Sequence, residues 1–490
     1  MIFDMDPDDG APARPRPGDT ARSPIVLPSL SHASSRVGTP RAGSPAPPAQ
    51  RRPSVSADVL SMLERQLDDA RIDSDYEDIA DNMHVEVPIV EEFVSDSVCE
   101  AAAPPCCSTA EDSGVCSPLE TGAAEGALPV RPRVTVDDFD VLKLIGKGGY
   151  GKVYLVQHKQ TGRHYAMKVL GKASILLQRR QITFTMTERS ILSEVQHPFI
   201  VKLFYAFQSN SKLYLIMEYV AGGELFTHMA NERIFSEDQA SFYAAELVLA
   251  IAHLHRLGIV FRDTKPENCL LSRTGHLVLT DFGLSKTALG EDGRTSTFCG
   301  TPAYMAPEVL ESSTSYDLSI DWWSLGILLY EMLTGEVPFK GKAPLQIAKN
   351  IAKMKVHYPN YITPDAKDLI IRLLRKQPAK RIGFGPRGIE NIKNHRFFRK
   401  IDWARLETDY ESFTPPIVPC VSGDADVSNF ALEFTEQQVP SSIAAHDSAA
   451  AAAAAAAATA AAAPGEVAAD PATAFQGFSF VANSVMDSVG

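Results

Sequence analysis

Long apolar runs and cysteine are both scarce in this chain of 490 residues. No apolar stretch approaches the roughly 18–20 residues that a membrane-spanning helix needs, which excludes a spanning protein. The start of the chain, MIFDMDPDDG, is acidic and lacks the basic residues and apolar core of a signal peptide. Seven cysteines are present, and the four that cluster lack the paired spacing of metal ligands: Cys99, Cys106, Cys107 and Cys116. We therefore expect reduced thiols and a cytoplasmic protein, with the nucleus as a second compartment.

Lysine is absent from the first 136 residues, which hold 11 arginines and 23 acidic residues. Residues 137–400 reverse the balance with 35 basic and 25 acidic residues, whereas residues 401–490 carry one arginine and 12 acidic residues. The net charge of −13 therefore averages a basic centre of +10 with acidic flanks of −12 and −11. The acidic total is unsuited to binding nucleic acid. We also expect a monomer that binds no membrane.

The two flanks have compositions that disfavour a packed core. Residues 1–136 are rich in Pro, Ser, Ala and Asp, so little apolar surface could offset the entropy of ordering them. One amphipathic piece, residues 59–67, could form a transient helix. Residues 449–463 are alanine apart from Thr459, and about 15 helical residues without packing are marginal. We predict a disordered regulatory region over 1–136, an alanine-rich spacer at 449–463 and a disordered end at 481–490.

The centre of the chain shows regular apolar periodicity. Alternating apolar residues predict strands early in this region, and apolar residues at helical spacing predict helices later. The strands are expected at 153–156, 164–169 and 212–217, and the helices at 236–257, 321–333 and 365–374. This order predicts an α+β domain of two lobes, a small β-rich one followed by a larger helical one.

A glycine-rich segment opens this domain. Glycines at 146, 148 and 151 form a G-x-G-x-x-G pattern, and glycine lets the backbone approach phosphate oxygens closely. A dinucleotide-binding loop of this pattern should open a helix, whereas residues 152–156 alternate like a strand. A strand, a glycine loop and a second strand followed by Ala-Met-Lys fit the nucleotide loop of protein kinases. We predict that ATP lies against the following residues: Ile145, Gly146, Lys147, Gly148, Gly149, Tyr150, Gly151, Lys152, Val153, Ala166 and Lys168.

The lysine of this pattern, Lys168, lies within an apolar strand, where an unpaired charge would be costly. Glu188, on a predicted helix, is the carboxylate expected to pair with it. Considered alone, Glu188 would be an ordinary exposed helix charge. Together with Lys168 it forms the ion pair that controls activity in protein kinases.

A second group of polar residues follows the expected helix at 236–257. The run Val260-Phe-Arg-Asp-Thr-Lys-Pro-Glu-Asn268 is followed, eighteen residues after Asp263, by Asp281-Phe-Gly. In the kinase pattern Asp263 orients the substrate hydroxyl or accepts its proton, and Lys265 neutralises charge on the transferred phosphoryl group. Asn268 and Asp281 are predicted to hold Mg²⁺. Their order and spacing behind the glycine loop make coincidence improbable.

On these motifs the chain resembles the eukaryotic protein kinases, with a kinase domain at 139–398. The resemblance implies that adenine binds at a hinge formed by Met217, Glu218 and Val220, with Glu224 beside it. It also implies that Glu224 and Glu267 receive arginines upstream of a target serine or threonine, through bidentate arginine–carboxylate pairs.

Two further pairs of motifs resemble structural contacts of the same family. Glu308, in Ala306-Pro-Glu, is expected to pair with Arg381, and Asp321 is expected to orient the backbone of the catalytic loop. Two residues of that loop depart from the family pattern. Phe261 replaces a histidine or tyrosine and should fill the same apolar slot. Thr264 replaces a leucine, and its hydroxyl needs a hydrogen-bond partner if buried, so catalysis could be weakened.

One subgroup resembles this chain more closely. Thr297-Phe-Cys-Gly-Thr301 resembles the activation segment of the AGC kinases, the group of the cyclic-AMP-dependent, Akt and S6 kinases. The resemblance implies that an upstream phosphoinositide-dependent kinase phosphorylates Thr297. The added charge would order the loop by pairing with an arginine, and Arg262 is the expected partner.

The AGC group also has a C-terminal tail, expected here at 399–480. Residues 414–419 and 430–435 resemble its middle, and Phe475-Gln-Gly-Phe-Ser-Phe480 resembles its hydrophobic motif, with Ser479 as phosphoacceptor. Ser442 aligns with the turn-motif serine, although no proline follows it. Phe475 and Phe478 are expected to enter a groove of the small lobe.

Within the group, the glycine loop and the hydrophobic motif most resemble the ribosomal-protein S6 kinases of the type with a single kinase domain. Phe3-Asp-Met-Asp6 is similar to the docking sequence that recruits target-of-rapamycin complex 1, although Pro7 replaces an apolar residue. No lipid-binding domain precedes the kinase motifs, which argues against the Akt branch. Arg51-Arg-Pro-Ser54 fits the expected basic substrate pattern and suggests autophosphorylation at Ser54.

The sequence therefore predicts a serine/threonine kinase that uses ATP and Mg²⁺ and acts on protein substrates with basic motifs. Two alternatives remain open. One is a kinase of another AGC branch. The other is a pseudokinase, a nucleotide-responsive scaffold, which Phe261 and Thr264 favour and the intact Lys168, Asp263 and Asp281 oppose.

Overall fold

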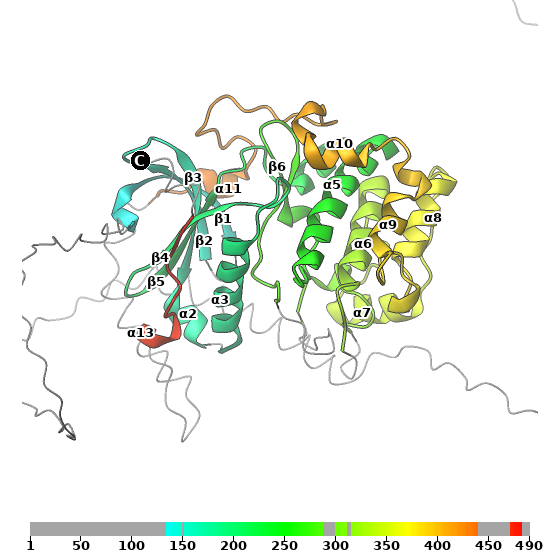
Figure 1. Cartoon of the computed structure of the whole chain (residues 1–490), viewed down its shortest axis with the longest axis horizontal. Helices are drawn as coiled ribbons and strands as arrows, with labels where there is room; N and C mark the ends of the chain where they lie inside the picture. Colours follow the sequence, from blue (N-terminus) through cyan, green and yellow to red (C-terminus); the bar gives the residue numbers. More distant parts are fainter. Residues whose placement is uncertain are drawn as a thin grey trace, which may run out of the picture. The chain divides into compact units, whose positions relative to one another are not determined.

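The computed structural model describes residues 134–148, 151–177, 179–287, 299–310, 315–439 and 471–482. Strands gather in the N-terminal part of this region and helices in the C-terminal part (Figure 1). The predicted two-lobed α+β fold is therefore confirmed. No helix in the described part of the chain is both long and apolar enough to cross a bilayer.

The small lobe is built on a six-stranded antiparallel sheet with the strand order β1-β2-β3-β5-β4-β8. Alternate residues of a strand lie on opposite faces, so Leu213 and Leu215 join one apolar cluster and Tyr214 and Ile216 another. The strands are β1 (Phe139–Gly148), β2 (Gly151–His158), β3 (His164–Gly171), β4 (Leu203–Gln208), β5 (Lys212–Glu218) and β8 (Phe480–Val481). β8 comes from the far end of the chain and pairs with β4.

Helices cover one face of this sheet. The short helix α2 (Lys172–Leu177) leads into α3 (Arg179–Glu194), which contacts β4 (Figure 1). Ile191 and Leu192 of α3 are buried in the same cluster as Leu213 and Leu215 of β5. This packing fixes α3, and with it Glu188, against the sheet that carries Lys168. A single 3₁₀ turn, η1 (Val136–Asp138), precedes β1.

The helical lobe is organised around α5 (Glu237–Arg256) and α6 (Ile320–Thr334), which pack against each other. Ser236 caps α5 by accepting a hydrogen bond from the backbone of Gln239, whose side chain bonds back to Ser236. Gly335 ends α6 in the left-handed conformation with φ 74°. The other helices are α4 (Leu225–Glu232), α7 (Pro344–Lys353), α8 (Pro364–Leu373), α9 (Gly388–Lys393) and α10 (Trp403–Thr408).

The remaining elements are short strands, 3₁₀ turns and two short helices of the tail. The strands β6 (Cys269–Leu271) and β7 (Leu277–Leu279) form a small antiparallel hairpin next to the 3₁₀ turn η2 (Pro266–Asn268). Further 3₁₀ turns are η3 (Pro302–Tyr304), η4 (Pro378–Lys380), η5 (Arg396–Phe398) and η6 (Tyr410–Ser412). In the tail, α11 (Leu432–Thr435) contacts β1, and α13 (Pro471–Ala474) precedes β8.

The expected strands and helices are all present, and their ends lie within two residues of the expected positions. One domain boundary also differs from expectation. The tail was expected to end at residue 480, but Val481 continues β8 and the backbone of Ala482 donates a 2.9 Å hydrogen bond to Phe204. The predicted transient helix at 59–67, the alanine-rich spacer and residues 483–490 lie outside the described residues.

Candidate active site

The Nζ of Lys168 contacts two carboxylates between the lobes. It lies 2.8 Å from Oε1 of Glu188 and 2.9 Å from Oδ1 of Asp281. Glu188 is buried on α3, whereas about half of the Asp281 side chain is exposed. Burial opposes the charge on Lys168, but Asp281 and Glu188 outweigh it and raise its pKa. The positive charge of Lys168 lowers the pKa of Asp281, so both groups stay ionised at neutral pH.

Asp263 is fixed by three neighbours in a second cluster. Its Oδ2 accepts a 2.8 Å hydrogen bond from Nδ2 of Asn268 and lies 2.8 Å from Nζ of Lys265. Its Oδ1 accepts a 2.9 Å hydrogen bond from the hydroxyl of Thr301. Lys265 also donates to that hydroxyl at 3.1 Å. The carboxylate is thus held in one orientation while its charge is compensated by Lys265.

The backbone of the catalytic loop is held from below by Asp321, as expected. The carboxylate of Asp321, which is fully buried, accepts hydrogen bonds from the backbone of Phe261 at 3.0 Å and of Arg262 at 2.8 Å. Arg262 and Asp281 both adopt positive φ angles, 73° and 58°. Such angles are costly for residues other than glycine and persist where surrounding contacts impose them. The expected pair between Arg381 and Glu308 is also formed, with two contacts of 2.6 and 2.9 Å.

The glycine segment lies at the turn between β1 and β2. Gly148 pairs with Gly151, and Lys147 pairs with Lys152. A Cβ on Gly151 would lie 2.1 Å from the carbonyl oxygen of Val169, so this position requires glycine. Ile145, Leu155 and Ala166 form a small buried cluster on this side of the sheet. Gly149 and Tyr150 lie outside the described residues.

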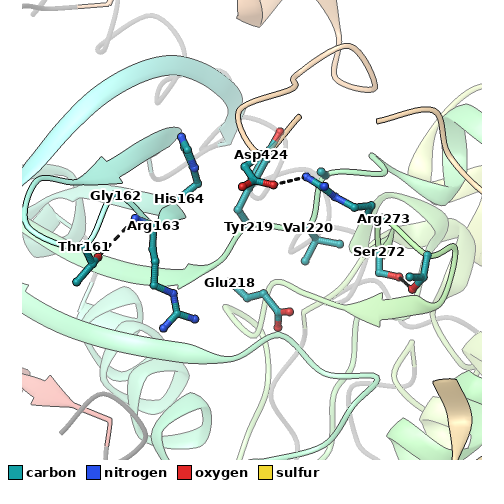
Figure 2. Close-up of a pocket in the computed structure, with 12 residues that line it drawn as sticks. Thr161, Gly162, Arg163, His164, Glu218, Tyr219, Val220, Ser272, Arg273 and Asp424 are labelled. Atoms are coloured by element: carbon teal, nitrogen blue, oxygen red, sulfur yellow. Dashed lines mark hydrogen bonds and ion pairs between the residues drawn. The ribbon is translucent and has the colours of Figure 1, made fainter. Parts of the chain in front are cut away.

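The residues expected at the hinge follow directly from β5. Met217 pairs with Ala166 of β3, and the backbone nitrogen of Glu218 donates to Lys202 at 2.9 Å. Glu218 and Val220 of this hinge also line a cleft of about 580 Å³ (Figure 2). The β2–β3 turn, the β6–β7 turn and the tail form the rest of its border. There Arg273 donates a 2.6 Å hydrogen bond to Asp424 of the tail.

Glu224 and Glu267, the predicted arginine receptors, lie close enough to interact. Burial raises the pKa of Glu224, and the negative charge of Glu267 raises it further, while Lys265 acts in the opposite direction. A guanidinium placed between two such carboxylates would offset both the desolvation of Glu224 and its repulsion by Glu267. The two side chains come from the N-cap of α4 and from η2, so the fold brings together acids 43 positions apart in the sequence.

Asn268 and Asp281 are the two residues expected to bind a metal ion. Carboxylate and amide oxygens are the ligands that Mg²⁺ prefers, and it binds through one or two carboxylates plus phosphate oxygens and water. Asn268 uses its amide nitrogen to bond Asp263, which orients the amide oxygen for another partner. The described residues contain no cluster of three or more metal-binding side chains, so a metal here would need ligands from a bound nucleotide. The residues present fit Mg²⁺ held in that way.

The tail reaches the small lobe through its hydrophobic motif. Phe475 and Phe478 are both fully buried, as expected, and join the cluster that contains Ile191 of α3. The Nε of Arg189 donates a 2.8 Å hydrogen bond to the carbonyl oxygen of Phe478, and Nη2 donates a 2.9 Å bond to that of Ser479. The Ser479 side chain itself is exposed.

Several predicted residues have no described environment. Thr297, Ser442 and Ser54 lie outside the described residues, as does Phe3-Asp6. The expected partner of Thr297, Arg262, is buried, and within the described part of the chain its Nη2 has no hydrogen-bond partner.

The substitution at Thr264 leaves a buried polar atom. Its side chain is fully buried, and its Oγ1 has no hydrogen-bond partner among the described residues. Phe261 is also fully buried and packs edge-on against Phe282 at 5.1 Å between ring centroids. The expectation that phenylalanine fills an apolar slot is therefore confirmed. Thr264 has the buried hydroxyl, without a partner among the described residues, that was expected to be unfavourable.

Sequence reasoning missed two residues of the site. Thr301 was expected as the last residue of the activation-segment motif, yet its hydroxyl also contacts Asp263. Phe430 was assigned to the tail alone, but it packs beside the cluster of Ile145 and Ala166 and stacks on Tyr219 with ring centroids 5.9 Å apart. The Thr301–Asp263 and Phe430–Tyr219 contacts each join residues that are distant in sequence. No local pattern indicates such contacts, so only the order of motifs in the family could have predicted them.

Comparisons with known proteins agree with this geometry. The model of the "Protein kinase domain" family matches residues 139–398, and that of the "Protein kinase C terminal domain" matches residues 421–480. The human protein "Ribosomal protein S6 kinase alpha-4" is 44% identical over 363 residues, which are 72% of this chain and 44% of that protein.

Two RAC-beta kinases are similar to a comparable degree. "RAC-beta serine/threonine-protein kinase A" of Xenopus laevis is 44% identical over 308 residues, 63% of each chain. "RAC-beta serine/threonine-protein kinase" of Rattus norvegicus is 41% identical over 333 residues, 68% of each chain. The chain thus spans between about two fifths and two thirds of the length of these relatives. It belongs to the protein kinase family, and its kinase domain followed by a kinase C-terminal domain makes it a member of the AGC group of serine/threonine kinases.

Proposed function

We propose that the protein is an active kinase that transfers the γ-phosphoryl group of ATP to serine or threonine in basic segments of other proteins. The observation that carries this proposal is the pair of contacts from Lys168 to Glu188 and Asp281. Such a three-way contact between the lobes is the arrangement that positions nucleotide phosphates in protein kinases.

Each side chain then has a definite task. Bound MgATP supplies the phosphoryl group, with Asn268 and Asp281 as the residues that would hold Mg²⁺. Lys168 binds the phosphates, and Glu188 keeps Lys168 in place. Asp263 orients the substrate hydroxyl and accepts its proton, and Lys265 offsets negative charge at the reacting phosphoryl group.

Substrate selection is proposed to rest on Glu224 and Glu267. Each would bind an arginine at about three or five residues before the phosphorylated position. The basic charge of residues 137–400 repels basic substrates in general, so these local carboxylates must provide the attraction. The mutual repulsion of the two acids, seen in the raised pKa of Glu224, supports this role.

Regulation is proposed to act through phosphorylation at Thr297 and Ser479, with an upstream phosphoinositide-dependent kinase acting on Thr297. The buried Nη2 of Arg262 supports the first site, because a phosphate there would provide the missing acceptor. A link to target-of-rapamycin complex 1 would run through Phe3-Asp6. Ser442 and Ser54 are further proposed phosphosites.

The branch within the group is also a proposal. The glycine loop and hydrophobic motif favour a kinase similar to the S6 kinases. The similarity to RAC-beta kinases, at 41–44% identity, favours another AGC branch as the second candidate. Loss of Ser479 phosphorylation on rapamycin treatment of cells would support the first branch, and insensitivity would support the second.

The central experiment measures transfer of labelled phosphate from MgATP to an Arg-x-Arg-x-x-Ser peptide. We expect transfer by the full chain and none by an Asp281→Ala variant. A peptide with alanine at both arginine positions is the matched control for specificity. Absence of transfer by enzyme phosphorylated at Thr297 would favour the pseudokinase. Mapping phosphate on the same active enzyme tests Ser54, and an unmodified Ser54 would exclude autophosphorylation there.

A further inference from the structure

Exposed lysines gather around the C-terminal end of α7 in the helical lobe. The place of this helix in the lobe is seen in Figure 1. Helix α7 buries Ala348, Ile351 and Ala352 against the lobe. Its other side presents exposed lysines, and two apolar side chains nearby are also exposed: Met354 by 49% and Tyr361 by 60%. We name this the α7 basic surface and define it by Lys349, Lys353, Met354, Lys355, Tyr358, Tyr361, Lys367, Arg375 and Lys376.

Hydrogen bonds and a ring contact join these residues into one continuous surface. The Nζ of Lys376 donates hydrogen bonds of 2.9 and 2.7 Å to the carbonyl oxygens of Ala352 and Met354, at the end of α7. Lys367 lies over the ring of Tyr358 at 5.3 Å from its centroid. Arg375 is close enough to Tyr358 to act on its pKa. Lys349 and Lys353 are four residues apart on one helix and share a face.

The acids nearest in sequence to this surface are few and already paired. No acidic residue occurs between Glu336 and Asp365, a stretch that contains five lysines. Glu336 binds Lys340. Asp365 binds Arg399, and Asp368 binds Arg372 at 2.9 Å and His395 at 3.1 Å. In the described part of the chain the α7 basic surface therefore has cations in excess of its acids.

One segment of the chain has the complementary composition. Residues 68–100 hold twelve acidic residues and a single arginine, so they carry a net −11 of the −12 in residues 1–136. Apolar residues are interspersed with the acids, as in His84-Val-Glu-Val-Pro-Ile-Val-Glu-Glu-Phe-Val94. Carboxylates would match the lysines, and the valines and Phe93 would match the exposed Met354 and Tyr361.

The segment can reach the surface. Residues 101–133 separate it from the first described residue, and 33 residues extend to at most roughly 110 Å. A compact domain of about 300 residues is only about 50 Å across. Because the two partners belong to one chain, the effective concentration is high even if each contact is weak.

We propose that residues 68–100 bind the α7 basic surface within the same molecule. The contact has a consequence for the site, because α7 packs against η3. That turn follows Thr301, whose hydroxyl bonds Asp263. A bound segment therefore lies on a helix that packs against the turn after Thr301. It leaves that surface as ionic strength rises.

The test is zero-length carbodiimide cross-linking of the full chain, which joins lysines to carboxylates in direct contact, followed by peptide mapping. At about 0.1 M salt we expect cross-links from Lys349, Lys353, Lys355 and Lys376 to acids within 68–100. At about 1 M salt, where the Debye length falls to about 3 Å, their yield should fall by about fivefold or more. The readout needs no catalytic activity, so it stands or falls independently of the proposed function.

Charge-reversal variants test whether the cross-links depend on the lysines of the α7 basic surface. Replacing Lys349, Lys353 and Lys355 together by glutamate should reduce the Lys376 cross-links by about fivefold or more. The matched control replaces three exposed cations elsewhere by glutamate, namely Lys202, Arg256 and Arg387. It should leave the yield of the Lys376 cross-links unchanged.

A second variant leaves the described fold untouched. It replaces acids between 73 and 81 by Asn or Gln (D73N, D75N, E77Q, D78N, D81N). The cross-links from Lys376 to acids that remain, including Glu86, Glu91, Glu92 and Asp96, should then decrease. Mixing isotope-labelled and unlabelled chain identifies contacts between molecules. Equal cross-linking to lysines all over the domain, a yield indifferent to salt and charge reversal, or cross-links formed mainly between different molecules would each overturn the proposal.

Discussion

The Nε of Arg189 donates a 2.8 Å hydrogen bond to the carbonyl oxygen of Phe478. Its neighbour in sequence, Glu188, binds Lys168. Two successive residues of α3 thus connect the end of the tail with the catalytic cleft. Docking of the tail and formation of the Lys168–Glu188 pair both depend on the position of this one helix, so the two events should be coupled.

The first prediction concerns this coupling. Phe478→Ala removes a fully buried ring and should cost tail docking about 3 kcal/mol, a factor of roughly 100 in the ratio of docked to undocked tail. We expect a lower kcat/KM in enzyme phosphorylated at Thr297, and faster hydrogen exchange at β4, because β8 pairs with that strand. Leu432→Ala, at a tail position that is 68% exposed, is the control and should change neither quantity. Unchanged activity of the Phe478 variant would refute the coupling.

The second prediction concerns the buried hydroxyl at Thr264. Thr264→Val keeps the shape of the side chain and removes the atom that has no hydrogen-bond partner among the described residues. The free energy of unfolding should rise by about 1–2 kcal/mol, because the desolvation cost of that hydroxyl disappears. Denaturant titration measures this. Thr334→Val is the comparison, since the Thr334 hydroxyl donates a 2.8 Å bond to Tyr330 and its loss should destabilise. A similar loss in both variants would mean that Thr264 has a partner in solution.

The two lobes and the site could be predicted to different degrees. Helix α5 and the strands β2, β3 and β5 follow from local signals, namely apolar residues at helical spacing and apolar alternation, and they lie where the pattern placed them. The pairing of β8 with β4 was not foreseen, because two strands separated by more than 270 residues carry no local signal for each other. The contact of Thr301 with Asp263 was missed for the same reason. Sequence motifs identify which groups take part, and only the fold shows which of them touch.

The third prediction concerns pH and His197. Burial lowers the pKa of His197, and together with the nearby charges of His253 and Arg256 it brings the pKa to about 4. In the unfolded chain the same group titrates near 6.5. The folded state therefore loses stability as the pH falls from about 6.5 towards 4, because only the unfolded state then binds the proton. Allowing for partial exposure, the loss is about 2 kcal/mol.

The variant His197→Asn tests this, because its side-chain oxygen can still accept the hydrogen bond from the backbone of Phe199, now 3.2 Å from Nδ1. Thermal unfolding of both proteins should be measured between pH 4 and 8. The difference in Tm should be constant above about pH 7 and shift in favour of the variant below it. Parallel curves over the whole range would show that His197 does not titrate as proposed.

The last prediction concerns substrate charge. Glu224→Gln removes one carboxylate of the proposed arginine receptor and should raise KM for an Arg-x-Arg-x-x-Ser peptide by about tenfold or more, since a charge-assisted pair contributes about 1.5–3 kcal/mol. The value of kcat should change little, because Glu224 contacts neither Asp263 nor Lys168 in the described structure. Burial and Glu267 raise the pKa of Glu224, so this carboxylate takes up a proton at a higher pH than an ordinary glutamate does. As the pH is lowered, the preference for arginine should therefore begin to weaken at a higher pH than it would with an unperturbed glutamate. Two further peptides, each with one of the two arginines replaced by alanine, show which arginine Glu224 binds. If the variant lost activity equally on peptides with and without arginine, Glu224 would be a structural residue, and the receptor would have to be sought among other acids of the cleft.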